Sequence, residues 1–179
     1  PPRSTLFPYT TLFRSVRVDH YLYSKNDRRR IRDELHVADN ELLIGHIGRF
    51  TEAKNHEFIL NVFKEIKKIR PDSRLLLVGD GELRSEIEAK IDESGISDSI
   101  LLYGASGDTA ALLSAMDIFL FPSLWEGLGI ALIEAQCNGL PCFISESVPN
   151  TAVITSNVHK YRIARGAREW AKSIIEQPH

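Results

Sequence analysis

Short apolar runs alternate with longer segments of helical period along most of this sequence, and this alternation constrains the fold more than any other feature. The runs are dense in Leu, Ile, Val and Phe and show little polar alternation. Strands of a parallel sheet have this character because both of their faces are covered. Five strands are therefore expected, over 42–48, 75–78, 100–103, 118–121 and 142–145.

Helices are expected between and beyond these runs. The first is expected to be capped by Asn26 or Asp27. The clearest carries one apolar stripe and ends before Pro71. That stripe consists of Phe58, Ile59, Val62, Phe63, Ile66 and Ile69. The expected helices cover 26–35, 56–69, 83–91, 109–115, 130–137 and 167–176.

This order of elements predicts an α/β fold with a doubly wound, Rossmann-like parallel sheet. Because the crossovers of such a sheet are right-handed, the carboxyl ends of all strands share one edge, and ligands bind along it. The loops that follow the strands are therefore the places to look for functional residues.

Two of these loops contain groups that suit an anion. Arg49 and Lys54 follow the first strand just before a helix, and cations beside a helix N-terminus favour anions, although two solvated surface charges fit the spacing as well. Gly79 and Gly81 follow the second strand, where glycine lets the backbone approach a ligand, or simply forms a tight turn. Arg84 stands where the dinucleotide fingerprint needs a third glycine, which argues against an NAD site, and the sequence contains no Walker A motif.

The loop after 118–121 is the richest in candidate groups. Glu126 precedes a turn through Gly127, Leu128 and Gly129 that opens a helix, so backbone N–H groups there could face a phosphate. Glu134 lies one to two turns into that helix on an otherwise apolar face. A carboxylate in that setting needs a hydroxyl or a cation as partner, unless it is a helical charge that faces solvent.

Glu126 and Glu134, in the sequence FPSLWEGLGIALIEA, resemble the E-x7-E motif of the large retaining GT-B glycosyltransferases of group 1, family 4. Gly48-Arg49 and Lys54 resemble the phosphate-binding residues of that family. The resemblance covers about 16–176. It also includes Gly79-Asp80-Gly81, Tyr103-Gly104, Val148-Pro149-Asn150 and Trp170-Ala171, the last two in the manner of bacterial exopolysaccharide enzymes.

The resemblance implies a role for each matching residue in binding a nucleoside-diphosphate sugar, with a UDP-sugar favoured. Glu126 would contact the donor sugar near the reacting carbon as the catalytic residue, and Glu134 would accept both ribose hydroxyls. The other donor-binding residues would be Arg49, Lys54, Gly127, Leu128 and Gly129 at the diphosphate, Tyr103 and Gly104 at the base, and Gly81 in the second loop.

No metal or other cofactor is expected. Arg, Lys and helix N–H groups can stabilise the charge that develops on the leaving phosphate. The sequence has no D-x-D motif and no His pair at ligand spacing, so His46 and His56 are expected to be bystanders.

The resemblance also implies that 16–179 form the C-terminal, nucleotide-sugar-binding half of a GT-B fold, without the N-terminal acceptor-binding domain. Because the family's cleft lies between the two halves, we expect this fragment to bind nucleotide weakly and to transfer little or no sugar. A polysaccharide or a lipid-linked molecule would be the acceptor. The missing half could also give the parent enzyme a peripheral membrane contact. Two alternatives stay open: a nucleotide-sugar epimerase and a non-catalytic nucleotide-binding domain.

Charge, cysteine content and apolar runs limit the classes of binding partner that are expected. With 22 Lys and Arg against 24 Asp and Glu, the net charge is −2, which gives no reason to expect nucleic acid. Cys137 and Cys142 match no zinc or redox spacing, and we expect two buried thiols in a cytoplasmic protein. No apolar run approaches the ~20 residues that a spanning helix needs.

The first fifteen residues differ in character from the rest. They read PPRSTLFPYTTLFRS, with Thr-Leu-Phe at 5–7 and again at 11–13. The stretch resembles the translation of a sequencing adaptor, so we expect a foreign or disordered leader without function. A natural N-terminal arm is the alternative.

Overall fold

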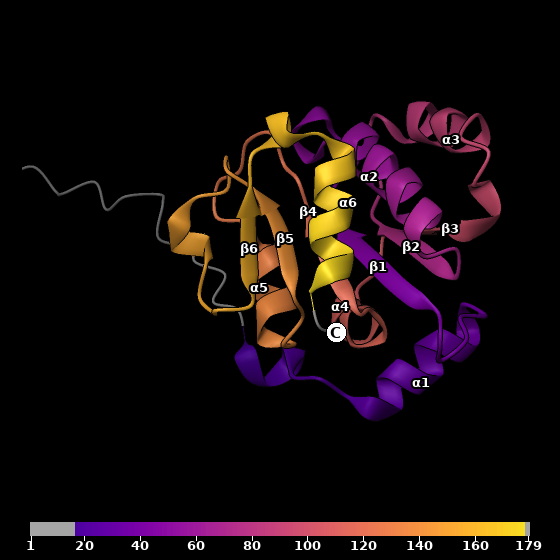
Figure 1. The fold of residues 1–179 in the computed structure, drawn as a ribbon. Helices are drawn as coiled ribbons and strands as arrows, with labels where there is room; N and C mark the ends of the chain where they lie inside the picture. Colours follow the sequence, from indigo (N-terminus) through magenta and orange to yellow (C-terminus); the bar gives the residue numbers. More distant parts are fainter. Residues whose placement is uncertain (1–16, 178–179) are drawn as a thin grey trace, which may run out of the picture.

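A computed structural model describes residues 17–177 of the chain, and the expectation for 1–15 lies outside the described residues. The core is a six-stranded sheet in the order β3-β2-β1-β4-β5-β6, and every neighbouring pair is parallel (Figure 1). The strands are β1 (Leu42–Ile47), β2 (Ser73–Val78), β3 (Ile100–Gly104), β4 (Ile118–Phe121), β5 (Cys142–Ser145) and β6 (Val158–Tyr161). The predicted α/β class and the five predicted strands are confirmed.

The sheet separates two apolar layers. Alternate side chains of β1 show why: Leu43 packs with α4 and α5 on one face, whereas Leu42 and Ile44 pack with α2, α3 and α6 on the other. Covering both faces of a parallel sheet gives the doubly wound arrangement. The helices are α1 (Lys25–Glu34), α2 (His56–Ile69), α3 (Arg84–Asp92), α4 (Thr109–Ala115), α5 (Ile130–Cys137) and α6 (Ala167–Glu176). Short 3-10 helices are η1 (Val18–Tyr21), η2 (Glu52–Lys54), η3 (Ser97–Ser99), η4 (Asn150–Ala152) and η5 (Ile163–Arg165).

Three details of the predicted helices and thiols are wrong. The cap of α1 is Ser24, whose hydroxyl accepts from the N–H of Asp27, because the helix begins one residue earlier than expected. Ile69 leaves the apolar stripe of α2, since it is the last residue of that helix and is 48% exposed. Cys142 is buried, but Cys137 is only partly buried at the end of α5.

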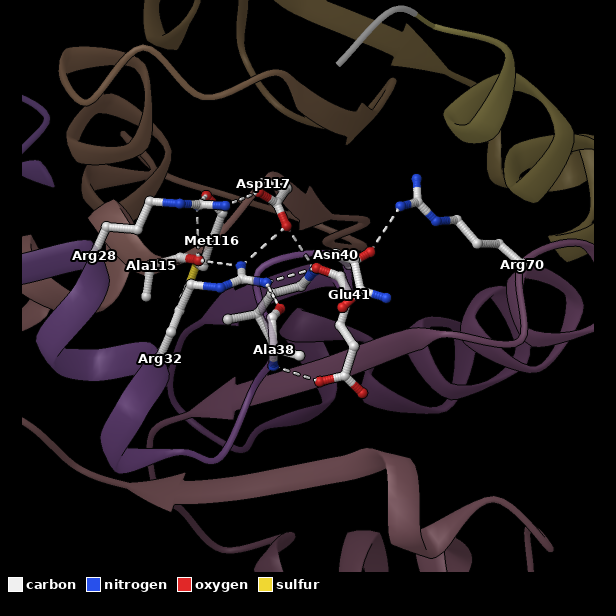
Figure 2. Close-up of polar contacts among 10 residues, drawn as sticks. Arg28, Arg32, Ala38, Asn40, Glu41, Arg70, Ala115, Met116 and Asp117 are labelled. Atoms are coloured by element: carbon white, nitrogen blue, oxygen red, sulfur yellow. Dashed lines mark hydrogen bonds and ion pairs between the residues drawn. The ribbon is translucent and has the colours of Figure 1, made fainter.

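A buried ionic network holds α1 at the amino ends of β1 and β4 (Figure 2). The Arg32 guanidinium donates to the Asp117 carboxylate at 3.3 Å and to the carbonyl oxygens of Ala115, Ala38 and Glu41. Asp117 also accepts from the backbone N–H of Leu43 in β1, at 2.7 Å, and from Arg28, at 2.6 Å. The network therefore fastens the edge of the sheet opposite to the carboxyl ends of the strands.

Within 17–177, no helix combines the length and the apolar character that crossing a membrane requires.

Candidate functional site

The strand order places a topological switch between β1 and β4. The chain runs from β1 outward to β2 and β3, and then returns to add β4 on the other side of β1. The loops that leave the carboxyl ends of these two strands diverge there, and ligands of doubly wound sheets bind in the crevice between such loops. Those loops are 48–55 and 122–129, which contain most of the predicted site residues.

Two hydrogen bonds to backbone carbonyl groups join these loops. The backbone N–H of Leu124 donates to the carbonyl oxygen of Ala53 at 2.8 Å. The side-chain amide of Asn55 donates to the carbonyl oxygen of Pro122 at 3.3 Å. Asn55 has a left-handed φ of 56°, which Asn tolerates better than most residues, and α2 starts directly after it. The two loops thus form one connected surface.

Lys54 and Glu126 meet at this surface in an ion pair. Their side chains are only 17% and 9% exposed, and the Lys54 ammonium also lies 4.8 Å from the centre of the Phe121 ring. The pair brings together the residue predicted to hold a diphosphate and the residue predicted to contact a sugar. Attraction between largely buried charges is less screened than at the open surface.

The glycine turn before α5 leaves backbone donors unused. Gly129 has a left-handed φ of 66° and precedes the first residue of the helix. At Gly127, an added Cβ would meet no atom within 4 Å. Within 17–177, the N–H groups of Gly127, Leu128 and Gly129 donate to no other group of the chain. Unpaired N–H groups at a helix start suit an anion, as predicted for this turn.

Glu134 lies near a residue for which the sequence carried no signal. Glu134 is partly buried, and the phenol of Tyr21 in η1 lies close enough to affect its pKa. Burial raises the pKa of Glu134, and the Tyr21 phenol offsets part of that rise. The alternative of a helical charge that only faces solvent therefore does not describe Glu134.

Arg49 lies apart from the Lys54–Glu126 pair. Its side chain is 74% exposed, and its Nε lies 3.5 Å from a carboxylate oxygen of Glu82 in the β2–α3 loop. Such exposed pairs contribute little to stability, so the guanidinium can exchange this partner for another anion at low cost.

Gly79 and Gly81 have no room for a side chain, because the backbone of the β1 loop packs against them. A Cβ on Gly81 would come within 2.5 Å of the carbonyl oxygen of Phe50, and one on Gly79 within 2.0 Å of that of Gly48. Gly79 also has a φ of 144°. These glycines permit a close approach to the backbone of the β1 loop, whereas the sequence suggested either an approach to a ligand or a tight turn.

Hydrogen bonds connect the end of β3 to α1 and to the β2–α3 loop. The hydroxyl of Tyr103 donates to the carboxylate of Glu34 in α1 at 3.0 Å, and this bond raises the pKa of Tyr103. The carbonyl oxygen of Gly104 accepts from the N–H of Gly79 at 2.8 Å. The predicted base-binding residues thus adjoin the β2 loop, and β2 and β1 separate their strand, β3, from β4.

His46 and His56 are buried below the Lys54 loop. Burial lowers the pKa of His56 to about 4, with nearby Lys54 adding to the effect, and it lowers that of His46 well below the usual value. The Nδ1 of His46 lies 2.9 Å from the carbonyl oxygen of Leu120, so in the neutral ring it carries the proton. Among the residues described, no three His, Cys, Asp or Glu side chains gather as metal ligands would.

Comparison with known sequences identifies the family. A model of the "Glycosyl transferases group 1" family matches residues 27–177. The chain is 40% identical to EpsF of Bacillus subtilis over 112 residues, which are 63% of this chain and 29% of EpsF. It is 32% identical, over 132 residues, to the UDP-Gal:alpha-D-GlcNAc-diphosphoundecaprenol alpha-1,3-galactosyltransferase of Escherichia coli, covering 72% of this chain and 34% of that enzyme. The chain thus spans about a third of the length of these curated relatives.

Solved structures show the same fold. Anabaena HepE in complex with UDP-glucose superposes with a TM-score of 0.78 at 23% identity, over 88% of this chain and 44% of HepE. The C-terminal domain of a group 1 glycosyl transferase from Francisella tularensis superposes with a TM-score of 0.74 at 18% identity, over 88% of this chain and 85% of that domain. The fold is that of one half of a GT-B glycosyltransferase. Since the family model matches nearly all of the described residues, the chain belongs to the group 1 family of glycosyl transferases.

Proposed function

We propose that this chain is the donor-binding domain of a retaining glycosyltransferase and binds a nucleoside-diphosphate sugar between the carboxyl ends of β1 and β4. One observation carries the proposal: Lys54, Glu126 and the unpaired N–H groups of 127–129 meet at the topological switch. A cation beside free N–H donors at a helix start suits a diphosphate, and a carboxylate next to them suits sugar hydroxyls.

The roles of the remaining residues follow from their places in the fold. Arg49 exchanges Glu82 for the diphosphate, and Glu134 accepts hydroxyl groups of the ribose. The base lies toward Tyr103 and Gly104, at the far side of the β2 loop. A uridine nucleotide is favoured, because the similar fold of HepE was solved with UDP and with UDP-glucose and the E. coli relative is named for UDP-Gal.

Catalysis by these groups is electrostatic. When the bond from the sugar to the diphosphate breaks, negative charge develops on the leaving phosphate, and Lys54, Arg49 and the N–H groups before α5 stabilise it in place. These donors already supply two positive charges and a helix N-terminus, so we propose that no metal is needed. Glu126 binds hydroxyls of the sugar near the reacting carbon.

The acceptor belongs to the other half of the enzyme. We propose a polysaccharide or lipid-linked acceptor, since the name of the E. coli relative specifies a diphosphoundecaprenol-linked sugar. Transfer would need an N-terminal domain that closes the cleft, and the isolated chain would bind nucleotide with little or no turnover.

Calorimetric titration of UDP, GDP and ADP into the chain tests the proposal. We expect one nucleotide, UDP in the first place, to bind, and both Glu134→Ala and Lys54→Ala to weaken it. Binding that neither substitution changes would place the nucleotide elsewhere and overturn the proposed site. Nucleotide binding without sugar transfer by a two-domain enzyme would point instead to a non-catalytic domain.

A further inference from the structure

The loop between β4 and α5 carries an exposed tryptophan beside the Lys54–Glu126 pair. Trp125 directly precedes Glu126 and is 54% exposed, whereas the Glu126 side chain is only 9% exposed. Two further apolar side chains at this turn are also exposed, Leu128 by 49% and Ile130 by 37%. Single exposed apolar side chains are common on protein surfaces, but such a group at a binding edge indicates a molecule that covers it.

The backbone on both sides of Trp125 is held in place. The N–H of Leu124 donates to the β1 loop at 2.8 Å, and the hydroxyl of Ser145 in β5 donates to the carbonyl oxygen of Ser123. On the other side, the ion pair fixes Glu126. The loop therefore presents the indole to solvent from a fixed position, which lowers the cost of ordering it when a ligand binds.

The other tryptophan of the chain shows which partners Trp125 lacks. Trp170 is fully buried, its ring contacts those of Phe58 and Tyr161, and its N–H donates to a backbone oxygen at 3.0 Å. Among residues 17–177, no aromatic ring contacts Trp125 in this way and no acceptor binds its N–H. The exposed part of the indole is therefore available to a bound molecule.

The surroundings of the indole suit a single sugar ring. Gly127 lies between Trp125 and Leu128 in the chain, and an added Cβ there would meet no atom within 4 Å. The Glu126 carboxylate and the unpaired N–H groups of 127–129 can bind hydroxyl groups. A pyranose combines such hydroxyls at its rim with apolar C–H groups on its faces. A few partly exposed side chains are too small a surface for a stable protein interface, which takes about 800 Å² from each partner.

We propose that Trp125 stacks against the hexose of the bound nucleotide sugar, and that it sets the affinity for the sugar as distinct from the affinity for the nucleotide. The proposal rests on the proposed function, in which the donor sugar lies beside Glu126. Trp125 is then a specificity-determining residue, because the indole favours donors whose ring presents an apolar face to it. A role in folding alone would affect UDP and UDP-sugars alike.

Tryptophan fluorescence tests this contact directly. The chain has two tryptophans and Trp170 is 0% exposed, so the neutral quencher acrylamide should act on Trp125. Among UDP-glucose, UDP-galactose and UDP-N-acetylglucosamine at saturation, at least one should lower the quenching about twofold relative to UDP, because it covers the ring. In Trp125→Phe only Trp170 remains, and quenching should be weak and equal with every ligand.

Calorimetry separates the sugar from the nucleotide. Trp125→Ala should weaken binding of the protecting UDP-sugar about 2- to 12-fold, as for the loss of an aromatic contact, and should change UDP affinity less than about twofold. Because Trp125 is exposed, the fold should tolerate the substitution. Ile69→Ala is the control, since Ile69 is 48% exposed at the last residue of α2 and should leave both affinities unchanged.

The outcomes distinguish this proposal from the one on which it rests. If UDP does not bind, or binds without dependence on Lys54, the proposed uridine-nucleotide site is wrong and this inference falls with it. If UDP binds through Lys54 and no UDP-sugar shields Trp125 more than UDP does, only the contact with the sugar is overturned. An equal loss of affinity for UDP and UDP-sugar in Trp125→Ala would also overturn it, because the indole would then act on the nucleotide or on the fold.

Discussion

Lys54 and Glu126 are 72 residues apart in the sequence and form an ion pair at the carboxyl edge of the sheet. Each is the principal charged neighbour of the other, so the pair is neutral as it stands. A diphosphate that approaches Lys54 therefore competes with Glu126, and the carboxylate that it displaces becomes available to hydroxyl groups. Removing the charge of Lys54 should therefore weaken nucleotide binding, whereas removing the charge of Glu126 should not.

Lys54→Ala should weaken UDP binding about 10- to 100-fold, because a charge-assisted hydrogen bond contributes about 1.5–3 kcal/mol. Glu126→Gln should bind UDP as tightly as wild type or more tightly, since Lys54 no longer has a competing anion. Calorimetry measures both. Lys68→Ala, in an exposed pair near the other end of α2, serves as the control, and a Glu126→Gln variant that loses UDP affinity would contradict this competition.

Gly81→Ala should destabilise the fold by about 1–3 kcal/mol, because the new methyl group would lie 2.5 Å from the backbone oxygen of Phe50 and the two loops must separate. Gly127→Ala is the matched substitution in open space and should leave stability unchanged or raise it by about 0.4–1 kcal/mol. Urea unfolding measures both. Equal effects of the two substitutions would show that the contact with Phe50 does not require a glycine.

Asp117→Ala should cost about 3–5 kcal/mol of unfolding free energy, because it leaves the buried charge of Arg32 without its carboxylate (Figure 2). Asp72→Ala removes the exposed partner of Arg70 and should cost less than about 1 kcal/mol. Chemical denaturation gives both values. The network lies at the amino ends of β1 and β4, so the folded fraction of Asp117→Ala should still bind UDP normally.

The stability of the protein should fall as the pH drops below neutrality, in part through His56. Its pKa is about 4 in the fold against 6.5 for an exposed imidazole. Between pH 6.5 and pH 4, the unfolded chain therefore binds a proton at His56 that the folded chain does not bind. The unfolding free energy that His56 contributes is fully present above about pH 6.5. It is lost as the pH falls from 6.5 to about 4, at up to about 1.4 kcal/mol per pH unit.

Replacing the imidazole tests this linkage. Between pH 7 and pH 5, His56→Phe should lose about 2 kcal/mol less unfolding free energy than the wild type, because it has no such proton to bind. His36→Asn, at an exposed left-handed position, should follow the wild type. Parallel pH profiles for wild type and His56→Phe would mean that His56 titrates normally in the fold.

Most of the fold follows from local pattern. The helices α2, α4, α5 and α6 and the strands β4 and β5 have the predicted bounds, because continuous apolar runs and a helical period suffice where both faces of a sheet are covered. The exception is the edge strand β6 (VHKY), in which Lys160 is exposed and Val158, His159 and Tyr161 are only partly buried. An edge strand needs little apolar surface, so its sequence does not distinguish it from a loop.

Part of the candidate site could likewise be predicted from local sequence, and part could not. The sequence by itself determined which strand-end loops carry the charges, glycines and helix starts, since these depend on neighbouring residues. Only the tertiary structure decided that Lys54 meets Glu126, because that contact requires β4 to lie beside β1. The need for glycine at Gly81 was likewise decided by the backbone of Phe50. Local pattern reflects how a segment buries its own surface, whereas a site depends on which segments the whole sheet brings together.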